Sequence, residues 1–135
     1  MALRCVIVDD NTGFLHAAST LLEQEGLRII GTAVNTADAL RCAAELHPDV
    51  TLLDIDLHGE SGFDLAWRLA GDPDLRPGAL IFVSAHAEED VADLVETSPA
   101  VGFLSKAALS AGSIERLVRA ARGLGRRAES PGGCA

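Results

Sequence analysis

Residues 3–10 read Leu-Arg-Cys-Val-Ile-Val-Asp-Asp, a short apolar run that ends at two carboxylates. The run is rich in β-branched residues, so we predict a buried strand. Four further apolar runs follow, at residues 27–34, 50–53, 79–83 and 101–104, and each has the same character. We therefore predict five short strands, spread evenly along the chain.

Amphipathic segments separate the five predicted strands. The N-cap is Asn11 or Thr12 in the first predicted helix and Asn35 or Thr36 in the second. We predict helices before Gly26 and at residues 37–46, 63–70, 88–96 and 113–122. Short apolar strands that alternate with amphipathic helices are typical of a parallel sheet covered on both faces. We predict an α/β fold of the flavodoxin-like kind, a three-layer sandwich of five helices around a five-stranded parallel sheet of order 2-1-3-4-5.

Polar side chains stand where these strands end. Open α/β sheets bind ligands beyond the carboxyl ends of the strands, at the point where the winding direction reverses. In the predicted order that point lies between the first strand, which ends at Asp9 and Asp10, and the third, which ends at Asp54. The fourth and fifth strands bring Ser84 and Lys106 to the same edge. We expect all five side chains to converge there.

This set of side chains predicts a site for one divalent cation and one phosphoryl group. Three carboxylates at close quarters repel one another, and a hard cation with oxygen ligands, such as Mg²⁺, relieves that repulsion. Lys106 supplies a positive charge for an anion, and Ser84 supplies a hydroxyl donor. A carboxylate placed among a metal, a lysine and a hydroxyl is suited to attack phosphorus and form an aspartyl phosphate.

The same residues carry a family resemblance. The matching stretches are VIVDDN at residues 6–11, PDVTLLD at 48–54, Gly59 with Gly62, VSA at 83–85 and GFLSK at 102–106. Over about residues 3–123, the chain resembles the receiver domain of bacterial two-component response regulators, the CheY-like superfamily. The stretch after Lys106 looks most like the receivers of NarL/LuxR-type regulators.

The resemblance implies a role for each residue of the site. Asp54 would be the phosphoacceptor, with Ser84 and Lys106 assisting. Mg²⁺ would be held by the side chains of Asp10 and Asp54, by the main-chain carbonyl of Asp56, and by Asp9 largely through water. Ser84 and Phe103 would be the switch residues. The metal ligands would thus be Asp9, Asp10, Asp54 and Asp56.

The implied function is a phosphorylation switch that catalyses only its own phosphorylation and dephosphorylation. A sensor histidine kinase would donate the phosphoryl group to Asp54 with Mg²⁺, and Phe103 would rotate inward. The face made by the fourth helix, fifth strand and fifth helix would then bind a downstream protein or form a homodimer. We expect a receiver domain over residues 1–123 and a disordered basic tail over 124–135, with no output domain. A stand-alone receiver and a receiver cut from a longer regulator both remain open.

Three short stretches depart from the pattern of this family. His58 stands where a proline is usual, so we expect the loop after Asp54 to be looser. Ser98 and Pro99 interrupt the segment before the fifth strand, which puts the output face in doubt, and Ala107 replaces a commoner proline or aspartate. His86, two residues after Ser84, is a weaker candidate for biasing the water that hydrolyses the phosphoryl group.

Two other functions use similar residues. A phosphatase of the haloacid dehalogenase class has an Asp-x-Asp motif like Asp54-Ile55-Asp56, but there the nucleophile usually lies on the first strand, and this chain shows no cap domain. A pseudo-receiver would bind partners without ever taking phosphate. It usually lacks an aspartate or the lysine, and neither is missing here. The pseudo-receiver is the alternative that we retain.

Composition limits the remaining possibilities. A length of 135 residues leaves room for one domain, and a net charge of -9 argues against nucleic-acid binding. Near the C-terminus the charge reverses locally, through Arg116, Arg119, Arg122, Arg126 and Arg127. The three cysteines have no metal-ligand spacing, and the first apolar run is too short for a signal peptide or a membrane span. We therefore expect a cytoplasmic protein.

Overall fold

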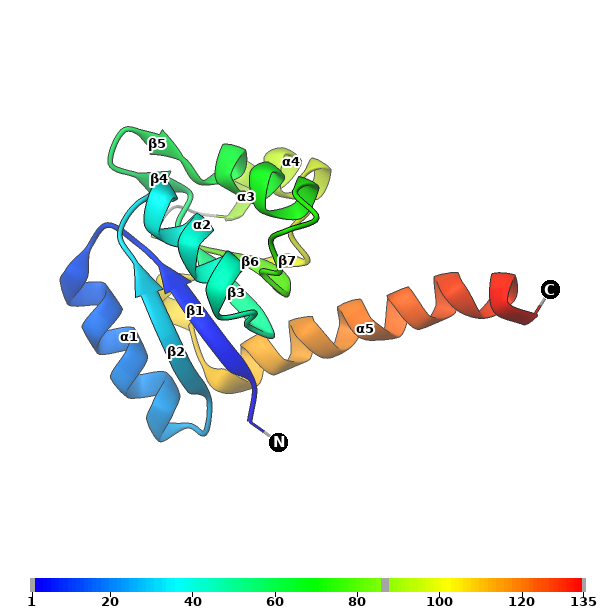
Figure 1. Cartoon of the computed structure of the whole chain (residues 1–135). Coiled ribbons are helices and arrows are strands. Elements are labelled where there is room, and N and C mark those ends of the chain that lie inside the picture. Colours follow the sequence, from blue (N-terminus) through cyan, green and yellow to red (C-terminus); the bar gives the residue numbers. More distant parts are fainter. Residues whose placement is uncertain (1, 86–87, 135) are drawn as a thin grey trace.

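In the computed structural model, the structure describes residues 2–85 and 88–134, without the side chains of residue 88 and of residues 124–134. Figure 1 shows a central sheet with helices on both sides. The elements in chain order are β1 (Arg4–Val8), α1 (Thr12–Gln24), β2 (Arg28–Ala33), α2 (Thr36–Glu45), β3 (Val50–Leu53), β4 (Asp56–Leu57), β5 (Glu60–Ser61), α3 (Gly62–Gly71), β6 (Ala79–Ser84), α4 (Glu88–Thr97), β7 (Gly102–Ser105), the 3-10 helix η1 (Lys106–Ala108) and α5 (Ala111–Cys134).

The main sheet has five parallel strands in the order β2-β1-β3-β6-β7. This confirms the predicted order 2-1-3-4-5, because β6 and β7 are the fourth and fifth long strands of the chain. The register pairs Val8 with Leu53, Leu53 with Phe82, and Phe82 with Phe103. The carboxyl ends of the strands therefore lie at one edge, and the residues that follow them are brought together.

Alternate residues of each strand face opposite layers of helices. In β1, Cys5 and Ile7 belong to a core cluster with residues of α1 and α5. Val6 and Val8 belong to a second cluster, with residues of α2 and α3. Partly buried side chains of α4 pack against the second cluster as well. The sheet is therefore covered by α1 and α5 on one face and by α2, α3 and α4 on the other, as a flavodoxin-like sandwich requires.

Asparagine side chains begin the first two helices. The Asn11 side chain accepts a hydrogen bond from the Phe14 amide at 3.0 Å, and the Asn35 side chain accepts one from the Asp38 amide at 2.8 Å. These bonds satisfy amide groups that a helix leaves without partners in its first turn. Of the two residues proposed for each N-cap, the structure selects the asparagine.

The loop after Asp54 contains a small hairpin that the sequence did not predict. Strands β4 and β5 pair in an antiparallel register, with His58 and Gly59 as the two-residue connection. Both connecting residues have positive φ, 45° and 87°, which is the mark of a type I′ turn. Glu60 Oε1 accepts a hydrogen bond from the Thr36 amide at 2.9 Å and ties the hairpin to α2. The loop therefore has a defined conformation, and its expected loosening at His58 stays a prediction.

The end of the chain also differs from expectation. The last helix was predicted to end at residue 122, and a disordered tail to follow, but α5 continues to Cys134 (Figure 1). Alanine, leucine, arginine and glutamate favour a helix through residue 129, whereas our prediction gave more weight to the Gly, Arg, Ser and Pro residues from Gly123 onward. The domain boundary at residue 123 stays a prediction. Over the part of the chain that the structure describes, no helix has the length and apolar character needed to cross a membrane.

Candidate functional site

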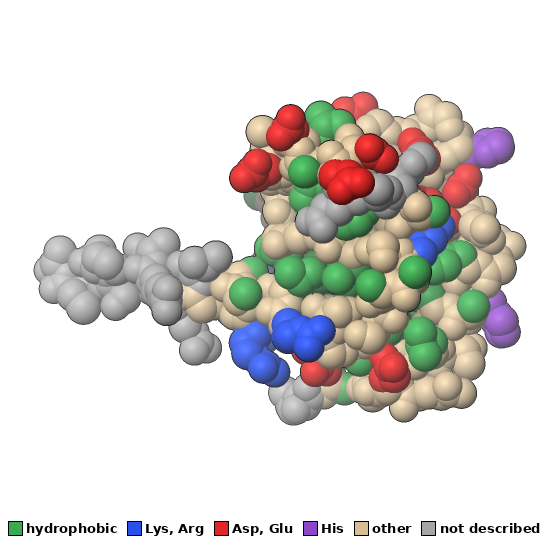
Figure 2. All heavy atoms as spheres, turned by 180° about the vertical axis from the view of Figure 1, so that it is seen from behind, with side chains coloured by type: hydrophobic (Ala, Val, Ile, Leu, Met, Phe, Trp, Pro, Cys, Tyr) green, Lys and Arg blue, Asp and Glu red, His purple; other side chains and the backbone are tan. Residues whose placement is uncertain are grey.

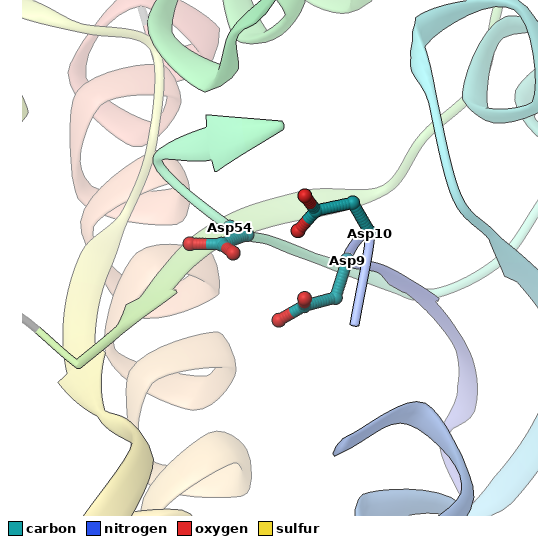
Figure 3. Close-up of side chains that lie close together, drawn as sticks. All are labelled: Asp9, Asp10 and Asp54. Atoms are coloured by element: carbon teal, nitrogen blue, oxygen red, sulfur yellow. The ribbon is translucent and has the colours of Figure 1, made fainter. Parts of the chain in front are cut away.

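Three carboxylates meet at the carboxyl edge of the sheet. Asp9 and Asp10 follow β1, Asp54 follows β3, and one carboxylate oxygen of each lies within 4.8 Å of the others. Figure 3 shows the three side chains side by side at the ends of their strands. Asp9 is 1% exposed and Asp54 is 8% exposed, whereas Asp10 is only partly buried. The predicted convergence at the switch point is therefore present.

Asp9 is the most deeply held of the three. Its Oδ1 accepts a hydrogen bond from the Asn11 amide at 2.8 Å, and its Oδ2 lies 2.8 Å from Nζ of Lys106. Although this second contact is an ion pair, Oδ2 is buried and receives no well-aligned hydrogen bond from any described residue. A buried carboxylate oxygen in this condition is favourably placed to interact with a further cation.

Asp54 is held in an environment that opposes its ionisation. Burial and, next in importance, the charge of Asp9 raise the pKa of its carboxyl to about 6, although Lys106 and the hydrogen bond from the Asp56 amide act to lower it. Lys106 Nζ lies 3.8 Å from Asp54 Oδ2, and the Asp56 amide lies 3.4 Å from Oδ1. Both contacts are long, so the charge of Asp54 is only partly compensated by the protein.

These residues fit a hard divalent cation. The donors are carboxylate oxygens, the ligand type that Mg²⁺ prefers, and their mutual repulsion is the physical reason for a cation to bind there. Asp56 begins the hairpin strand β4 and is an exposed residue. Ligation through its main-chain carbonyl stays a prediction.

The other predicted site residues lie nearby. Ser84 is buried at the end of β6, opposite Ser105 in the register with β7. The ring of Phe103 is buried in the same core cluster as Phe82. In this structure the ring is therefore already in the interior, where the expected rotation would bring it. His86 lies outside the described residues. The roles of Ser84 and Phe103 as switch residues stay predictions.

Comparison with known proteins accounts for this arrangement. The family model for the response regulator receiver domain matches residues 5–119. The chain belongs to this family. Its fold and its family together make it a receiver domain of two-component signalling, as the strand-end motifs predicted.

The relatives of this receiver include two regulatory proteins of Pseudomonas aeruginosa. It is 29% identical to the response regulator GacA of Pseudomonas aeruginosa over 122 residues, which cover 89% of this chain and 54% of GacA. It is 34% identical to the positive alginate biosynthesis regulatory protein of the same organism, again over 122 residues, covering 89% of this chain and 48% of that protein. The receiver thus spans about half the length of these two relatives.

Solved structures agree with this assignment. The signal receiver domain of NarL from Mycobacterium tuberculosis superposes with a TM-score of 0.71 at 27% identity, over 91% of this chain and 95% of that one. The response regulator domain of Thermotoga maritima CheB superposes with a TM-score of 0.73 at 21% identity, over 88% and 95%. The second likeness supports the fold alone.

Two residues beside the site were not found from the sequence of this receiver. The ring of Phe14 lies 4.2 Å from Lys106 Nζ, measured to the ring centroid. His58 Nδ1, in the hairpin turn, lies 3.7 Å from Asp10 Oδ2. The sequence offered one indication for Phe14. It lies in the first turn of α1, three residues after the N-cap Asn11, and this turn directly follows Asp9 and Asp10.

Proposed function

We propose that this receiver accepts a phosphoryl group on Asp54 in the presence of Mg²⁺ and so switches its binding to other proteins. The observation that carries the proposal is the meeting of Asp9, Asp10 and Asp54 with Lys106 at the switch point of the sheet. The sensor histidine kinase is the proposed donor. The proposal places the domain in the cytoplasm, in keeping with cysteines that lack the spacing of a disulfide framework.

In the proposed reaction, a carboxylate oxygen of Asp54 attacks the phosphorus of a phosphohistidine or an acyl phosphate. A new oxygen–phosphorus bond forms, and the bond between phosphorus and the donor atom breaks, with its electron pair leaving on the donor. Catalysis of this kind consists mostly of positioning and charge stabilisation. Asp54 has to be ionised to attack, and its raised pKa of about 6 still leaves it mostly ionised at neutral pH.

The remaining residues position charge around Asp54. Bound Mg²⁺ would neutralise charge on the carboxylates and the phosphoryl oxygens, held by the side chains of Asp10 and Asp54, the Asp56 carbonyl and, largely through water, Asp9. Lys106, 3.8 Å from Asp54, would pair with a phosphoryl oxygen. The Ser84 hydroxyl would donate to another phosphoryl oxygen and, with Phe103, would link phosphorylation to the output face.

The proposed output face comprises α4, β7 and α5. Figure 2 shows acidic side chains on one side of this face, basic side chains on the other, and hydrophobic side chains between them. Leu94 on α4 and Val101 before β7 are exposed apolar residues in this region. Among the side chains that the structure describes, the exposed acids of α4 are Glu89, Asp90, Asp93 and Glu96, and the exposed arginines of α5 are Arg116, Arg119 and Arg122. Such a face suits a protein partner or a second copy in which acids meet arginines.

The first test is phosphorylation by a small acyl phosphate. The protein is incubated with Mg²⁺ and acetyl phosphate, and intact mass is measured beside an Asp54→Asn control. One added phosphoryl group that requires both Asp54 and Mg²⁺ is the expected result. A folded protein that gains no mass under rapid quenching, and that consumes no acetyl phosphate, would support the pseudo-receiver instead.

A further inference from the structure

The ring of Phe14 lies against the charged end of Lys106. The ammonium nitrogen is 4.2 Å from the ring centroid, well inside the range of a cation–π interaction. Lys106 is the single lysine of the sequence, and its side chain is 23% exposed. The partial burial matters because an ammonium shielded from water is attracted to an aromatic face more strongly than an exposed one.

The two residues belong to a closed circuit of contacts. Lys106 pairs with Asp9, whose Oδ1 accepts a hydrogen bond from the Asn11 amide. The Asn11 side chain in turn accepts a hydrogen bond from the Phe14 amide, and the Phe14 ring faces Lys106. The N-cap hydrogen bond of α1 therefore helps to place the Phe14 ring relative to Asp9. The four contacts link Lys106, Asp9, Asn11 and Phe14 in a closed loop.

Lys106 needs such positioning because its surroundings offer it several partners. A lysine has a flexible four-carbon stem and a charge with no preferred direction. Here its ammonium is 2.8 Å from Asp9 and 3.8 Å from Asp54, at an acidic edge that also holds Asp10. An aromatic face on one side restricts the ammonium to the space between Asp9 and Asp54, which is where a phosphoryl group on Asp54 would need it.

We infer that Phe14 is a positioning residue for Lys106: its ring face holds the ammonium beside Asp9 and Asp54. This inference rests on the proposed function, since it concerns the lysine that would bind the phosphoryl group. Phe14 itself touches no reacting atom. Its effect on phosphoryl transfer acts through the placement of Lys106.

A role in packing alone makes a different prediction. Phe14 is partly buried and packs against the core cluster that contains Leu15, Leu22 and Ile114. If Phe14 served only that cluster, leucine would replace it with a modest loss of stability and no effect on Lys106. If the ring face holds the ammonium, leucine at position 14 does not hold Lys106 in place, whereas tyrosine does, because tyrosine keeps the aromatic face.

The first measurement is the NMR resonance of the Lys106 ε-methylene group. Since the chain has one lysine, lysine labelled with ¹³C at this carbon gives a single assigned signal. Protons above an aromatic face are shielded, so we expect the wild-type ε-protons at lower chemical shift than those of free lysine. Phe14→Leu should move them to the free-lysine position, and Phe14→Tyr should leave them shielded. A signal that is the same in the wild type and in Phe14→Leu would overturn the inference.

The second measurement is the rate of phosphorylation by acetyl phosphate. We expect Phe14→Leu to slow this rate about two- to thirtyfold, the range to which cation–π energies correspond, and Phe14→Tyr to restore it. Affinity for Mg²⁺ should stay within about twofold of the wild-type value, because the Phe14 side chain has no oxygen with which to bind the ion. Equal rates in the wild type and in Phe14→Leu would contradict the inference.

The two measurements separate this inference from the proposed function. If the wild-type protein takes no phosphoryl group, the proposed function fails, and the lysine resonance still decides whether Phe14 holds Lys106. If the wild type is phosphorylated but Phe14→Leu behaves like it, only the inference fails. Should Phe14→Leu not fold, Phe14→Met replaces it, since methionine also fills the space without an aromatic face.

Discussion

Lys106 and Asp9 form the tightest ion pair of the site, with 2.8 Å between Nζ and Oδ2. Because Asp9 is 1% exposed, removal of the lysine would leave a buried carboxylate without a cation. We expect Lys106→Met to lower the free energy of unfolding by about 3 kcal/mol at neutral pH without Mg²⁺, near the lower end for a broken buried pair because the lysine is partly exposed. Urea denaturation measures this change.

A second substitution tests the cause of that loss. Asp9→Asn in the Lys106→Met background removes the unpaired charge, and we expect it to recover more than half of the stability. A double-mutant cycle then gives the coupling between the two residues. If the double variant is less stable than Lys106→Met alone, the unpaired buried carboxylate of Asp9 is not the source of the loss.

Asp54 gives the metal-free protein a stability that depends on pH. Its pKa is about 6 in the folded state, raised by burial and by Asp9 from an ordinary value of 3.8. The folded state therefore binds more protons than the unfolded state between about pH 4 and pH 6, so this group's contribution to stability falls as pH rises through that window and stays low above it. We expect Asp54→Asn to stabilise the metal-free protein by about 2 kcal/mol at pH 7.5 and by much less at pH 4.5.

Denaturation of the wild type and Asp54→Asn over this pH range measures the effect. Addition of Mg²⁺ should narrow the difference at pH 7.5, because the cation compensates the carboxylate of the wild type. A constant gain at every pH would mean that Asp54 is not the titrating group.

The parts of this receiver that were predicted from sequence share one physical basis. The strand that ends at Asp9 and the one that ends at Asp54 are short, apolar and buried, and a parallel sheet brings their carboxyl ends to one edge. The place of Ser84 and Lys106 followed from the same topology. Site residues that are the first polar groups after a strand are thus visible in the sequence, because the fold alone determines where they lie.

The features that were missed are either very short elements or contacts between side chains far apart in the chain. Strands β4 and β5 have two residues each, which is too short for any periodicity, and their turn has histidine where asparagine before glycine would have been recognised. The contact of Phe14 with Lys106 joins side chains far apart in the chain and depends on their rotamers.

His58 adopts a backbone conformation that few residues tolerate. Its φ of 45° lies in the left-handed region, where asparagine is common and β-branched residues are strained. We expect His58→Asn to leave the stability nearly unchanged and His58→Val to lower it by about 1–2 kcal/mol. Both variants lose the imidazole that lies 3.7 Å from Asp10. The difference between their free energies of unfolding, measured by urea denaturation, therefore reports the backbone strain at position 58. Equal stabilities would argue against the type I′ turn.

Gly62 is required by the close approach of α3 to the main chain at Asp54. A Cβ at position 62 would overlap the main-chain oxygen of Asp54 and would lie 2.9 Å from Cα and O of Ile55. The Gly62 amide also donates to Ile55 O at 2.7 Å, so the helix cannot move away without losing that bond. Gly62→Ala must therefore displace the backbone that carries Asp54. We expect it to destabilise the protein by about 3 kcal/mol and to slow phosphorylation by acetyl phosphate at least tenfold.

Gly71 provides the matched control at the other end of the same helix. A Cβ there would meet nothing within 4 Å, and its φ is not in the left-handed region. Gly71→Ala should raise the stability by up to about 1 kcal/mol, since alanine is the better helix former, and should leave phosphorylation unchanged. If Gly62→Ala instead matched Gly71→Ala in both measurements, the backbone at Asp54 would accommodate a Cβ at position 62, and the close contact would not be a constraint. The comparison therefore tests how firmly α3 holds the phosphoacceptor.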